Sequence, residues 1–474
     1  MSVDHEFSMT LNGEAVRVAG VSPTSTLLEF LRRRGLSGAK EGCGDGDCGA
    51  CTVAMLGRGP DGRPGYQAVN ACLIMLGSVA GRALITVEGL SPRLGTLHPV
   101  QEAMVRTGGS QCGYCTPGFV MSMFVAYYNG GVTDAALEGN LCRCTGYSAI
   151  RRAAALLEGP REDDPFLKPL ERVPELKPLA YEVNGQHFFR PTTLEGAIKH
   201  LRDFPTAKLM AGATDLGLDI ARRHRHFPVI VSLEAVSELK GLEEAEDHVE
   251  LGAGLTLSEL MVRFRGRLPA LDEMLHLFAG RQIRNRATIG GNLGTASPIG
   301  DLAPVFLAHD AEVRLLGAEG ERLVPIADFF TGYRQTVLAP GELIASVRLP
   351  MTLAPGAVRG LNRSYKVSKR PADDISTVAA TFALDLDEND EVVKARLAYG
   401  GVAATPARAS AVEQALVGKP WSGETVQGVR RLLEASFTPL SDVRGSAGYR
   451  RRLVVNLFDK FLLETSPPET NRGR

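Results

Sequence analysis

The N-terminal part of the chain alternates apolar and polar residues, which is the pattern of a sheet with one buried face. In FSMTLNGEAVRV, residues 7–18, the alternation runs on both sides of Asn12-Gly13, and this pair predicts a hairpin turn. TLLEFLRRRG, residues 26–35, has helical spacing and predicts a short helix that ends at Gly35. Together with the strand-like TVAML at 52–56, these patterns predict a β-rich module over residues 1–88.

Helical spacing takes over in the next segment. HPVQEAMVRTG, residues 98–108, and TPGFVMSMFVAYY, residues 116–128, repeat apolar residues at helical intervals. We expect Thr116 to cap the second helix, with Pro117 at its first position. The prediction is a helical module over residues 89–157.

Proline and charge dominate the stretch that follows. Five prolines lie among dense charges in EGPREDDPFLKPLERVPELKPLA, residues 158–180. Because proline fixes φ and removes a backbone donor, neither a helix nor a central strand is expected there. We predict a linker over residues 158–184 that runs extended over the surface.

The rest of the chain mixes strand and helix patterns. VIVSLEAV at 229–236 and HVELGAGLTL at 248–257 are strand-like, and capping boxes that begin helices are predicted at Thr192-x-x-Glu195 and Thr256-x-x-Glu259. These patterns predict an α/β module over 185–355. A strand at 392–402 and a helix at 445–463 predict a small α+β module over 356–474. The fold class of the whole chain is therefore α+β multidomain.

Composition excludes several kinds of partner. The 474 residues are 44% hydrophobic and 23% charged, with a net charge of −1, which gives no electrostatic reason to bind nucleic acid or an anionic membrane. No apolar run approaches the ~20 residues of a membrane span. The start, MSVDHEFSMT, has no signal-peptide pattern. We expect a cytoplasmic protein.

All eight cysteines lie in the first 144 residues, which points to metal or redox chemistry in a reducing compartment. The first four have the spacing of plant-type [2Fe–2S] ferredoxins: Cys43-x4-Cys48-x2-Cys51 and then Cys72. A loop that curls around a cluster needs unusual backbone angles, which glycine permits, and glycines stand at Gly42, Gly44, Gly46 and Gly49. A structural zinc site is the alternative, although zinc sites favour paired CxxC motifs.

The other four cysteines are Cys112-x2-Cys115 and Cys142-x1-Cys144. A lone CxxC also fits a thioredoxin-like pair or half of a zinc site. Together the four can hold a second cluster near helix starts, where the helix dipole favours an anion.

QCGYCTPGFVMSM and GNLCRCTGYSAI resemble the helical [2Fe–2S] domain of the molybdenum hydroxylase family. A plant-type ferredoxin domain with the β-grasp fold precedes that domain in the family. The resemblance implies that the second cluster lies nearer a molybdenum cofactor, with Gln111 and Cys144 next to its pterin.

Two segments downstream have the composition of a ligand-binding backbone. KLMAGATDLGLDIARR, residues 208–223, reads as a strand, a glycine turn and a helix, whose free N–H groups can bind a diphosphate. LFAGRQIRNRATIGGNLGTASPIGDLAP, residues 277–304, is rich in small residues. There is no GxGxxG after a first strand, so a Rossmann site is not predicted. A long irregular loop is the plain alternative.

Both segments resemble the FAD domain of the xanthine dehydrogenase branch of that family, which has the vanillyl-alcohol-oxidase type of flavoprotein fold. The resemblance implies that residues 209–216 wrap the FAD diphosphate, namely Leu209, Met210, Ala211, Gly212, Ala213, Thr214, Asp215 and Leu216. It implies further FAD contacts at Phe278, Thr288, Gly291, Asn292, Asp301, Ile344 and Lys366. FFTGYRQT and KRPADD place Tyr333 and Asp373 at NAD-contacting positions, with Asp215 as a further candidate.

The order of domains implies a function. No molybdopterin-binding portion follows residue 474, so the chain resembles the small subunit of a two-subunit enzyme, with the molybdenum cofactor on a larger partner in an (αβ)2 heterotetramer. The implied oxidoreductase oxidises hypoxanthine and xanthine to urate and passes electrons through two [2Fe–2S] clusters and FAD to NAD+.

Three further possibilities stay open. The same electron chain could serve a hydroxylase of aldehydes or N-heterocycles, because substrate choice lies in the partner. A stand-alone NADH:acceptor reductase is a second possibility, and a zinc-bound interaction module is a third. The joining of all these domains in one chain argues against the carbon monoxide dehydrogenase branch, which splits them between polypeptides.

Overall fold

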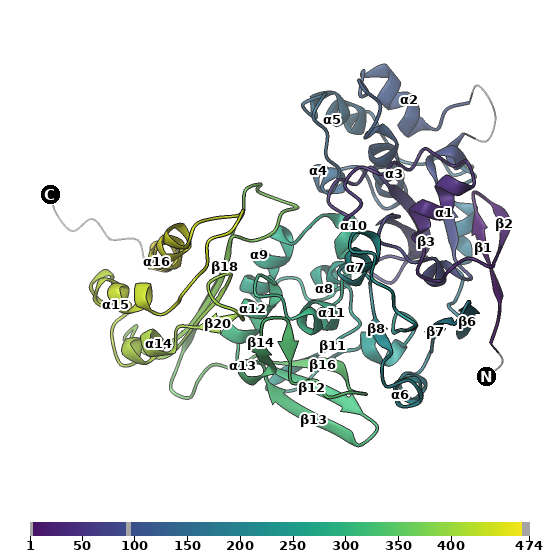
Figure 1. Ribbon diagram of the computed structural model, residues 1–474. Coiled ribbons are helices and arrows are strands. Elements are labelled where there is room, and N and C mark those ends of the chain that lie inside the picture. The colour runs from purple at the N-terminus through teal and green to yellow at the C-terminus, as the bar shows by residue number, and fades with distance from the viewer. Residues whose placement is uncertain (1–2, 92–95, 467–474) are drawn as a thin grey trace.

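The computed structural model describes residues 3–91 and 96–466. The predicted ranges 1–88, 89–157 and 356–474 therefore include residues outside the described part, as does the start MSVDHEFSMT. Figure 1 shows the N-terminal modules in purple and blue on one side, the central module in teal and green, and the C-terminal module in light green and yellow on the other side. Within the described ranges, no helix combines the length and the apolar character that crossing a membrane requires.

The N-terminal module is a five-stranded sheet of order β2-β1-β5-β3-β4. The predicted alternation buries Phe7, Met9 and Leu11 on one face of β1. Helix α1 begins after Thr26, whose side chain accepts from the N–H of Glu29, and packs its apolar face into the core of this module. The elements are β1 Glu6–Leu11, β2 Glu14–Ala19, α1 Leu27–Arg33, β3 Thr52–Arg58, β4 Pro64–Asn70 and β5 Ala83–Ile85.

The second module is helical, as predicted. Helix α3 is buried along almost its whole length because it packs against β3 and β4 of the first module as well as against its own neighbours. Its helices are α2 Pro99–Arg106, α3 Thr116–Tyr128, α4 Asp134–Leu137 and α5 Ser148–Ala155.

The segment predicted as linker contains more regular structure than its prolines indicate. Lys168–Glu171 forms a 3-10 turn, and Leu179–Val183 forms strand β6, which pairs with β7, Gln186–Arg190. Strand β6 lies at the edge of the sheet β6-β7-β9-β8. The proline rule excludes a central strand, but an edge strand that begins after the last proline loses no ladder bond.

The central module contains two sheets. The smaller sheet, β6-β7-β9-β8, carries α6 and α7, and the larger sheet, β10-β11-β16-β12-β13, packs against α8, α9, α11 and α12 around one apolar core. The other elements around the smaller sheet are α6 Leu194–Asp203, β8 Lys208–Met210, α7 Leu216–Ala221 and β9 Val229–Ser232. Those that follow are β10 Leu242–Glu244, β11 His248–Gly252, α8 Leu257–Arg263, α9 Pro269–Leu277, α10 Arg281–Arg284, α11 Ile289–Thr295, α12 Leu302–Ala308, β12 Glu312–Gly317, β13 Gly320–Pro325, α13 Ile326–Phe329, β14 Phe330–Gly332, β15 Gln335–Thr336 and β16 Leu343–Pro350.

Two predicted helix caps are wrong, and one is confirmed. Helix α6 is capped by Thr193, which accepts from the N–H of Gly196, so the predicted cap at Thr192 is wrong by one residue. Thr192 and Thr193 each carry a hydroxyl that can cap a helix, and only the direction of the backbone decides which of them does. At α3 the cap position falls on Cys115, and the hydroxyl of Thr116 bonds Ser110 instead. The capping box at Thr256 is confirmed.

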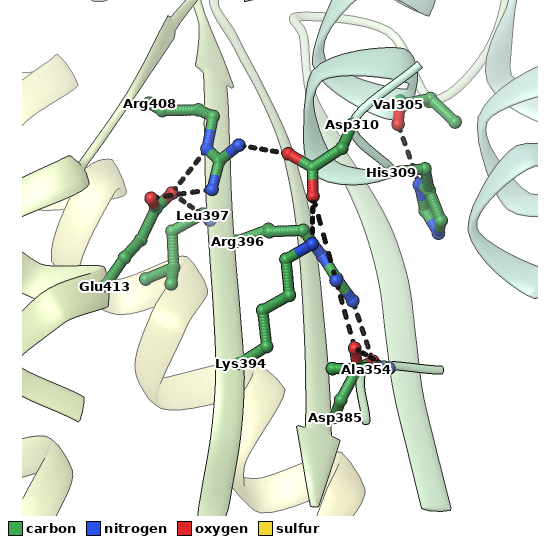
Figure 2. Close-up of polar contacts among 10 residues, drawn as sticks. All are labelled: Val305, His309, Asp310, Ala354, Asp385, Lys394, Arg396, Leu397, Arg408 and Glu413. Carbon is green, nitrogen blue, oxygen red and sulfur yellow. Dashed lines mark hydrogen bonds and ion pairs between the residues drawn. The ribbon is translucent and has the colours of Figure 1, made fainter. Parts of the chain in front are cut away.

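The C-terminal module is the sheet β17-β18-β19-β20, covered on one face by α14, α15 and α16 and packed on the other against α9 and α12. Figure 2 shows the charged part of that contact, where Asp310 after α12 meets Lys394, at 2.6 Å, and Arg408 from the sheet. The α+β multidomain class is confirmed. The bounds are β17 Arg359–Val367, β18 Val378–Leu386, β19 Val392–Gly400, β20 Ala407–Arg408, α14 Ser410–Leu416, α15 Gly423–Ala435 and α16 Ala447–Thr465.

Candidate functional site

The first cysteine loop depends on glycine in two ways. Gly44, Gly46 and Gly49 have φ values of +70°, +85° and +66°, which side-chain-bearing residues rarely adopt. Gly42 has no such angle, but a Cβ there would lie 2.7 Å from Cys48 Sγ. Three of the four predicted glycines are therefore required by backbone angle, and the fourth by close approach to a sulfur.

Backbone N–H groups point at the sulfurs of this loop. The N–H of Cys48 donates to Cys43 Sγ at 3.3 Å, and that of Cys43 donates to Cys48 Sγ at 3.4 Å. The N–H of Asp45 adds a third bond, at 3.5 Å, to Cys43 Sγ. Such dipoles stabilise anionic sulfur and tune the potential of a cluster.

The four thiols of this module meet as two pairs. A side-chain hydrogen bond joins Cys43 and Cys48, which raises the pKa of Cys43 and lowers the pKa of Cys48 to about 6. A second side-chain hydrogen bond joins Cys51 and Cys72, which are both buried, and it raises the pKa of Cys72. The charge of Cys43 raises the pKa of Cys72 further. Two neighbouring pairs of thiols fit a cluster of two irons that takes four cysteine ligands.

The helical module brings its four cysteines together in the same way. Side-chain hydrogen bonds between free thiols pair Cys112 with Cys144 and Cys115 with Cys142. The N–H of Thr145 donates to Cys142 Sγ at 3.5 Å. Cys142 is buried, whereas Cys112 and Cys144 are exposed, so one edge of this site faces the surface beside the exposed Gln111.

Within the described ranges, no group of three or more histidine, cysteine, aspartate and glutamate side chains is arranged to hold a single metal ion. The fit of a two-iron group at each site rests instead on the thiol pairs and on the N–H groups that face their sulfurs.

The two cysteine sites are in direct backbone contact. The N–H of Leu141, next to Cys142, donates to the carbonyl of Cys48 at 3.0 Å. The hydroxyl of Tyr114, between Cys112 and Cys115, donates to the carbonyl of Glu41 at 2.5 Å. The loop of the first site therefore carries hydrogen bonds from both cysteine segments of the second.

The same loop also touches the central module. A Cβ at Gly44 would lie 3.5 Å from Cδ of Arg222, at the end of α7, and one at Gly46 would lie 2.9 Å from Cδ1 of Ile283 on α10. Gly217 on α7 approaches the backbone of Leu73, next to Cys72. The first cysteine site thus lies between the second site and the two segments predicted to bind FAD.

Those two segments are themselves packed together. The turn after β8 holds Ala213 at φ +65°, and a Cβ at Gly212 would lie 1.6 Å from the carbonyl oxygen of Arg286. Only glycine permits this approach, which brings the turn beside Thr288, the N-cap of α11. On α11, Gly291 and Gly294 are exposed, so a strip of bare backbone faces outward.

Three further predicted contacts lie near α11. Asp301 is buried and forms a 2.8 Å ion pair with Lys366, and Ser376 donates a hydrogen bond to the same carboxylate. The side chain of Ile344 lies next to Gly294. The buried Oδ1 of Asn292 has no hydrogen-bond partner, which is the kind of orphaned polar atom that a bound group would satisfy. The glycine strip and this atom fit a flavin nucleotide.

The predicted NAD contacts lie at two places. Tyr333 is 65% exposed at the tip of the β14–β15 hairpin, and its neighbour Arg334 contacts Asp215 of the β8–α7 turn at 3.4 Å. Asp373 is buried beside Gly280, near Phe278, and its Oδ2 has no partner. Burial raises the pKa of Asp373 to about 6. The structure does not bring Tyr333 and Asp373 into contact through any bond among the described residues.

Sequence patterns did not reveal three contacts that join the modules. Asp47, inside the first cysteine loop, pairs with Arg370 at 2.6 Å. Glu234 is buried among Arg82, Arg190 and Arg286. Gln282 enters a buried group of polar side chains. No periodicity or motif spacing marks such pairs, because their members lie far apart along the chain.

Family comparisons match all four modules. Residues 9–76 match the 2Fe-2S iron-sulfur cluster binding domain, and residues 86–155 match the [2Fe-2S] binding domain. Residues 181–352 match the FAD binding domain in molybdopterin dehydrogenase, and residues 363–465 match the CO dehydrogenase flavoprotein C-terminal domain. The two cluster-binding modules and FAD binding are thereby supported.

Curated relatives include the xanthine dehydrogenases of Emericella nidulans, 34% identical over 97% of this chain, and of Arabidopsis thaliana, 33% identical over 93%. The chain spans only 38% of the length of these relatives.

Two solved structures with a similar fold are those of a carbon monoxide dehydrogenase and a quinoline 2-oxidoreductase. A carbon monoxide dehydrogenase chain from Hydrogenophaga pseudoflava is 28% identical with a TM-score of 0.54, covering 60% of this chain and 96% of that one. A quinoline 2-oxidoreductase chain from Pseudomonas putida 86 is 26% identical with a TM-score of 0.54, covering 58% and 94%. The chain therefore belongs to the molybdenum hydroxylase family, as the electron-transferring part that carries two [2Fe–2S] domains and an FAD-binding domain.

Proposed function

We propose that this chain is the electron-transfer subunit of a xanthine dehydrogenase. It would join a larger molybdopterin-binding subunit in an (αβ)2 heterotetramer that oxidises hypoxanthine and xanthine to urate, with NAD+ as acceptor. The similarity of 97% and 93% of this chain to parts of two xanthine dehydrogenases supports this proposal. When bound, the clusters carry single electrons and the flavin converts them into the pair that NAD+ accepts.

The observation that carries the proposal is an unbroken series of contacts between the predicted cofactor sites. The surface-exposed Cys112 and Cys144 belong to the second site, whose Leu141 bonds Cys48 of the first site. The first loop then lies against α7 and α10, which flank the glycine turn at Gly212. This order suits electrons that enter at the exposed edge and leave at the flavin.

Each residue has a role that matches its environment. The two thiol pairs of each module would hold the irons, and Gln111 and Cys144 would face the partner's pterin. The turn at 209–216 would hold the FAD diphosphate, and the α11 strip with Asn292, the Asp301–Lys366 pair and Ile344 would contact the rest of FAD. Tyr333 and Asp373 would orient NAD+. No side chain of this chain needs to move a proton on a purine.

The test is to purify the chain from its natural host and identify what accompanies it. The proposal expects a larger molybdenum-containing chain and NAD+ reduction that depends on xanthine. If that larger chain copurifies but no purine is turned over, the proposed xanthine substrate is refuted and the rest of the proposal stands. An isolated chain that only reduces dyes with NADH would support a stand-alone reductase instead.

A second candidate is the equivalent part of a hydroxylase for an N-heterocycle. The fold similarity to the quinoline 2-oxidoreductase chain favours this candidate over a stand-alone reductase or a zinc-bound module. The same purified complex, assayed with quinoline and with xanthine, separates the two hydroxylases.

A further inference from the structure

Three modules meet at one buried side chain, Gln282 of α10, which is 2% exposed. Its Nε2 lies 3.2 Å from Oγ1 of Thr52 in the first cysteine module. It also lies 3.1 Å from Oγ of Ser122 and 3.0 Å from Oδ1 of Asn140 in the second. Thr52, Ser122 and Asn140 are themselves at least 97% buried, so this polar group excludes water.

The hydrogen-bond directions in this group make Gln282 the donor. The hydroxyl of Ser122 already donates to Asn140 Oδ1, and that of Thr52 already donates to the carbonyl of Gly49. Their oxygens are left as acceptors, and the N–H groups of Gln282 are placed to donate to them. Asn140 Nδ2 also lies 3.5 Å from Oγ1 of Thr52. Asn140 adds a bond from its Nδ2 to the same carbonyl of Gly49 at 3.0 Å. Asn140 therefore already links the two cysteine modules, and the amide of Gln282 connects the central module to the same hydrogen-bonded group.

The backbones around this group are in direct contact. A Cβ at Gly49 would lie 2.1 Å from the carbonyl oxygen of Gly139, and one at Gly118 would lie 2.2 Å from that of Gly49. A Cβ at Gly139 would lie 2.2 Å from Oε1 of Gln282, and one at Gly280 would lie 2.5 Å from Cα of Gly139. Since no side chain fills this contact, small shifts of one module are transmitted to the others.

The group also lies next to the cysteines. Thr52 follows Cys51, Gly49 follows Cys48, and Asn140 lies two residues before Cys142. Ile283, next to Gln282, lies against Gly46 of the first loop. We propose that Gln282 is a positioning residue, whose amide fixes the spacing between the two iron–sulfur modules and the FAD module. This role rests on the proposed electron-transfer function.

The test compares Gln282→Met, which keeps the size and removes the donor, with the unchanged chain carrying its clusters and flavin. We expect amides of residues 139–142, which include the Leu141–Cys48 bond, to exchange hydrogen at least ten-fold faster. We also expect a weaker magnetic interaction between the two clusters after chemical reduction. Iron and flavin contents should stay the same. Gln427→Met, on the exposed face of α15, is the matched control and should change none of these.

Unchanged exchange and unchanged magnetic interaction in Gln282→Met, with only a lower melting temperature, would overturn the proposal. If that variant does not fold, Ser122→Ala removes one acceptor and should shift both readouts in the same direction by a smaller factor. Chemical reduction makes the result independent of NADH and of purines. A chain that fails to reduce NAD+ but shows both effects would therefore contradict the proposed function while supporting the role of Gln282.

Discussion

The two sets of cysteines have the same ligand number but different surroundings. Cys51 and Cys72 are buried in the core of the first module, whereas Cys112 and Cys144 are exposed at the surface. An exposed cluster edge suits electron exchange with another chain, and a buried one suits transfer inside this chain.

Single-cysteine changes should separate the two sites. Cys43→Ser is expected to remove the paramagnetic signal of one cluster and to lower the iron content from about four to about two per chain. Cys112→Ser should remove the other signal. Electron paramagnetic resonance with iron analysis measures both, and survival of both signals in Cys43→Ser would show that the ligand assignment is wrong.

A second residue-scale prediction concerns Glu234, which is 9% exposed. Burial opposes its ionisation, but Arg82 at 2.7 Å and Arg286 at 2.9 Å, with Arg190 nearby, lower its pKa to about 2. Replacing the charge with Glu234→Gln leaves three buried arginines without their anion, so we expect a loss of roughly 3–5 kcal/mol in unfolding free energy at pH 7.

The pH dependence follows from the direction of that shift. Because the folded pKa lies below the unfolded value of about 4.3, the stabilisation is fully present above that pH and is lost as pH falls towards 2. Denaturant titrations at pH 7 and pH 3 should therefore show a difference between wild type and Glu234→Gln that shrinks at low pH. Glu424→Gln, on an exposed helix face, is the control. An equal difference at both pH values would exclude the ion pairs as its cause.

At the scale of elements, the β8–α7 turn is the most constrained part of the predicted flavin site. Its backbone contacts the segment before α11, and α11 in turn exposes glycines. The geometry arises from two backbones that only glycine lets approach each other.

Gly212→Ala should therefore weaken FAD binding at least ten-fold, or about 1.4 kcal/mol. The added Cβ would overlap the carbonyl of Arg286, so the turn must move away from α11. Gly428→Ala on α15, where a Cβ meets nothing, is the control. Flavin absorbance of the purified variants, followed by titration with FAD, measures the effect. Wild-type affinity in Gly212→Ala would mean that the turn does not hold the cofactor.

At the scale of the whole molecule, charged contacts connect modules that are distant in sequence. Arg370, between β17 and β18, reaches back to Asp47 beside Cys48, and Asp373 lies three residues further on. The C-terminal module therefore touches the first cysteine loop as well as the FAD-binding module, on which it docks through Asp310 (Figure 2).

The Asp47–Arg370 pair should contribute little to stability, because both side chains are more than one-third exposed, at 44% and 35%. A double-mutant cycle with Asp47→Asn and Arg370→Gln should give a coupling energy of about 0.2–1 kcal/mol in unfolding. The same cycle measured on the apparent affinity for NADH should show coupling if the segment holding Asp373 positions the nucleotide. If the two substitutions have additive effects on NADH affinity, the Asp47–Arg370 pair does not help to position the nucleotide.

Local patterns predicted the elements well, since the information lies within a few residues. The hairpin at Asn12-Gly13, helix α1 and the capping box at Thr256 are confirmed. The cap of α6 lies one residue after the predicted one, because the hydroxyls of Thr192 and Thr193 are equivalent until the backbone direction is known. The cap position of α3 falls on Cys115, and the hydroxyl of Thr116 bonds Ser110 instead. Strand β6 was missed because its partner strand, rather than its own pattern, makes it a strand.

The sequence by itself determined the chemistry of the chain. Cysteine spacing specified two sets of four thiols, and the glycine-rich segments marked the backbone that we predict to approach a flavin, because a ligand set and a tight turn are encoded over short distances. Only the tertiary structure decided how these sites are joined. The bond from Leu141 to Cys48, the four charges at Glu234 and the amide of Gln282 each unite segments up to 230 residues apart. Such contacts depend on packing between modules, which no local pattern records.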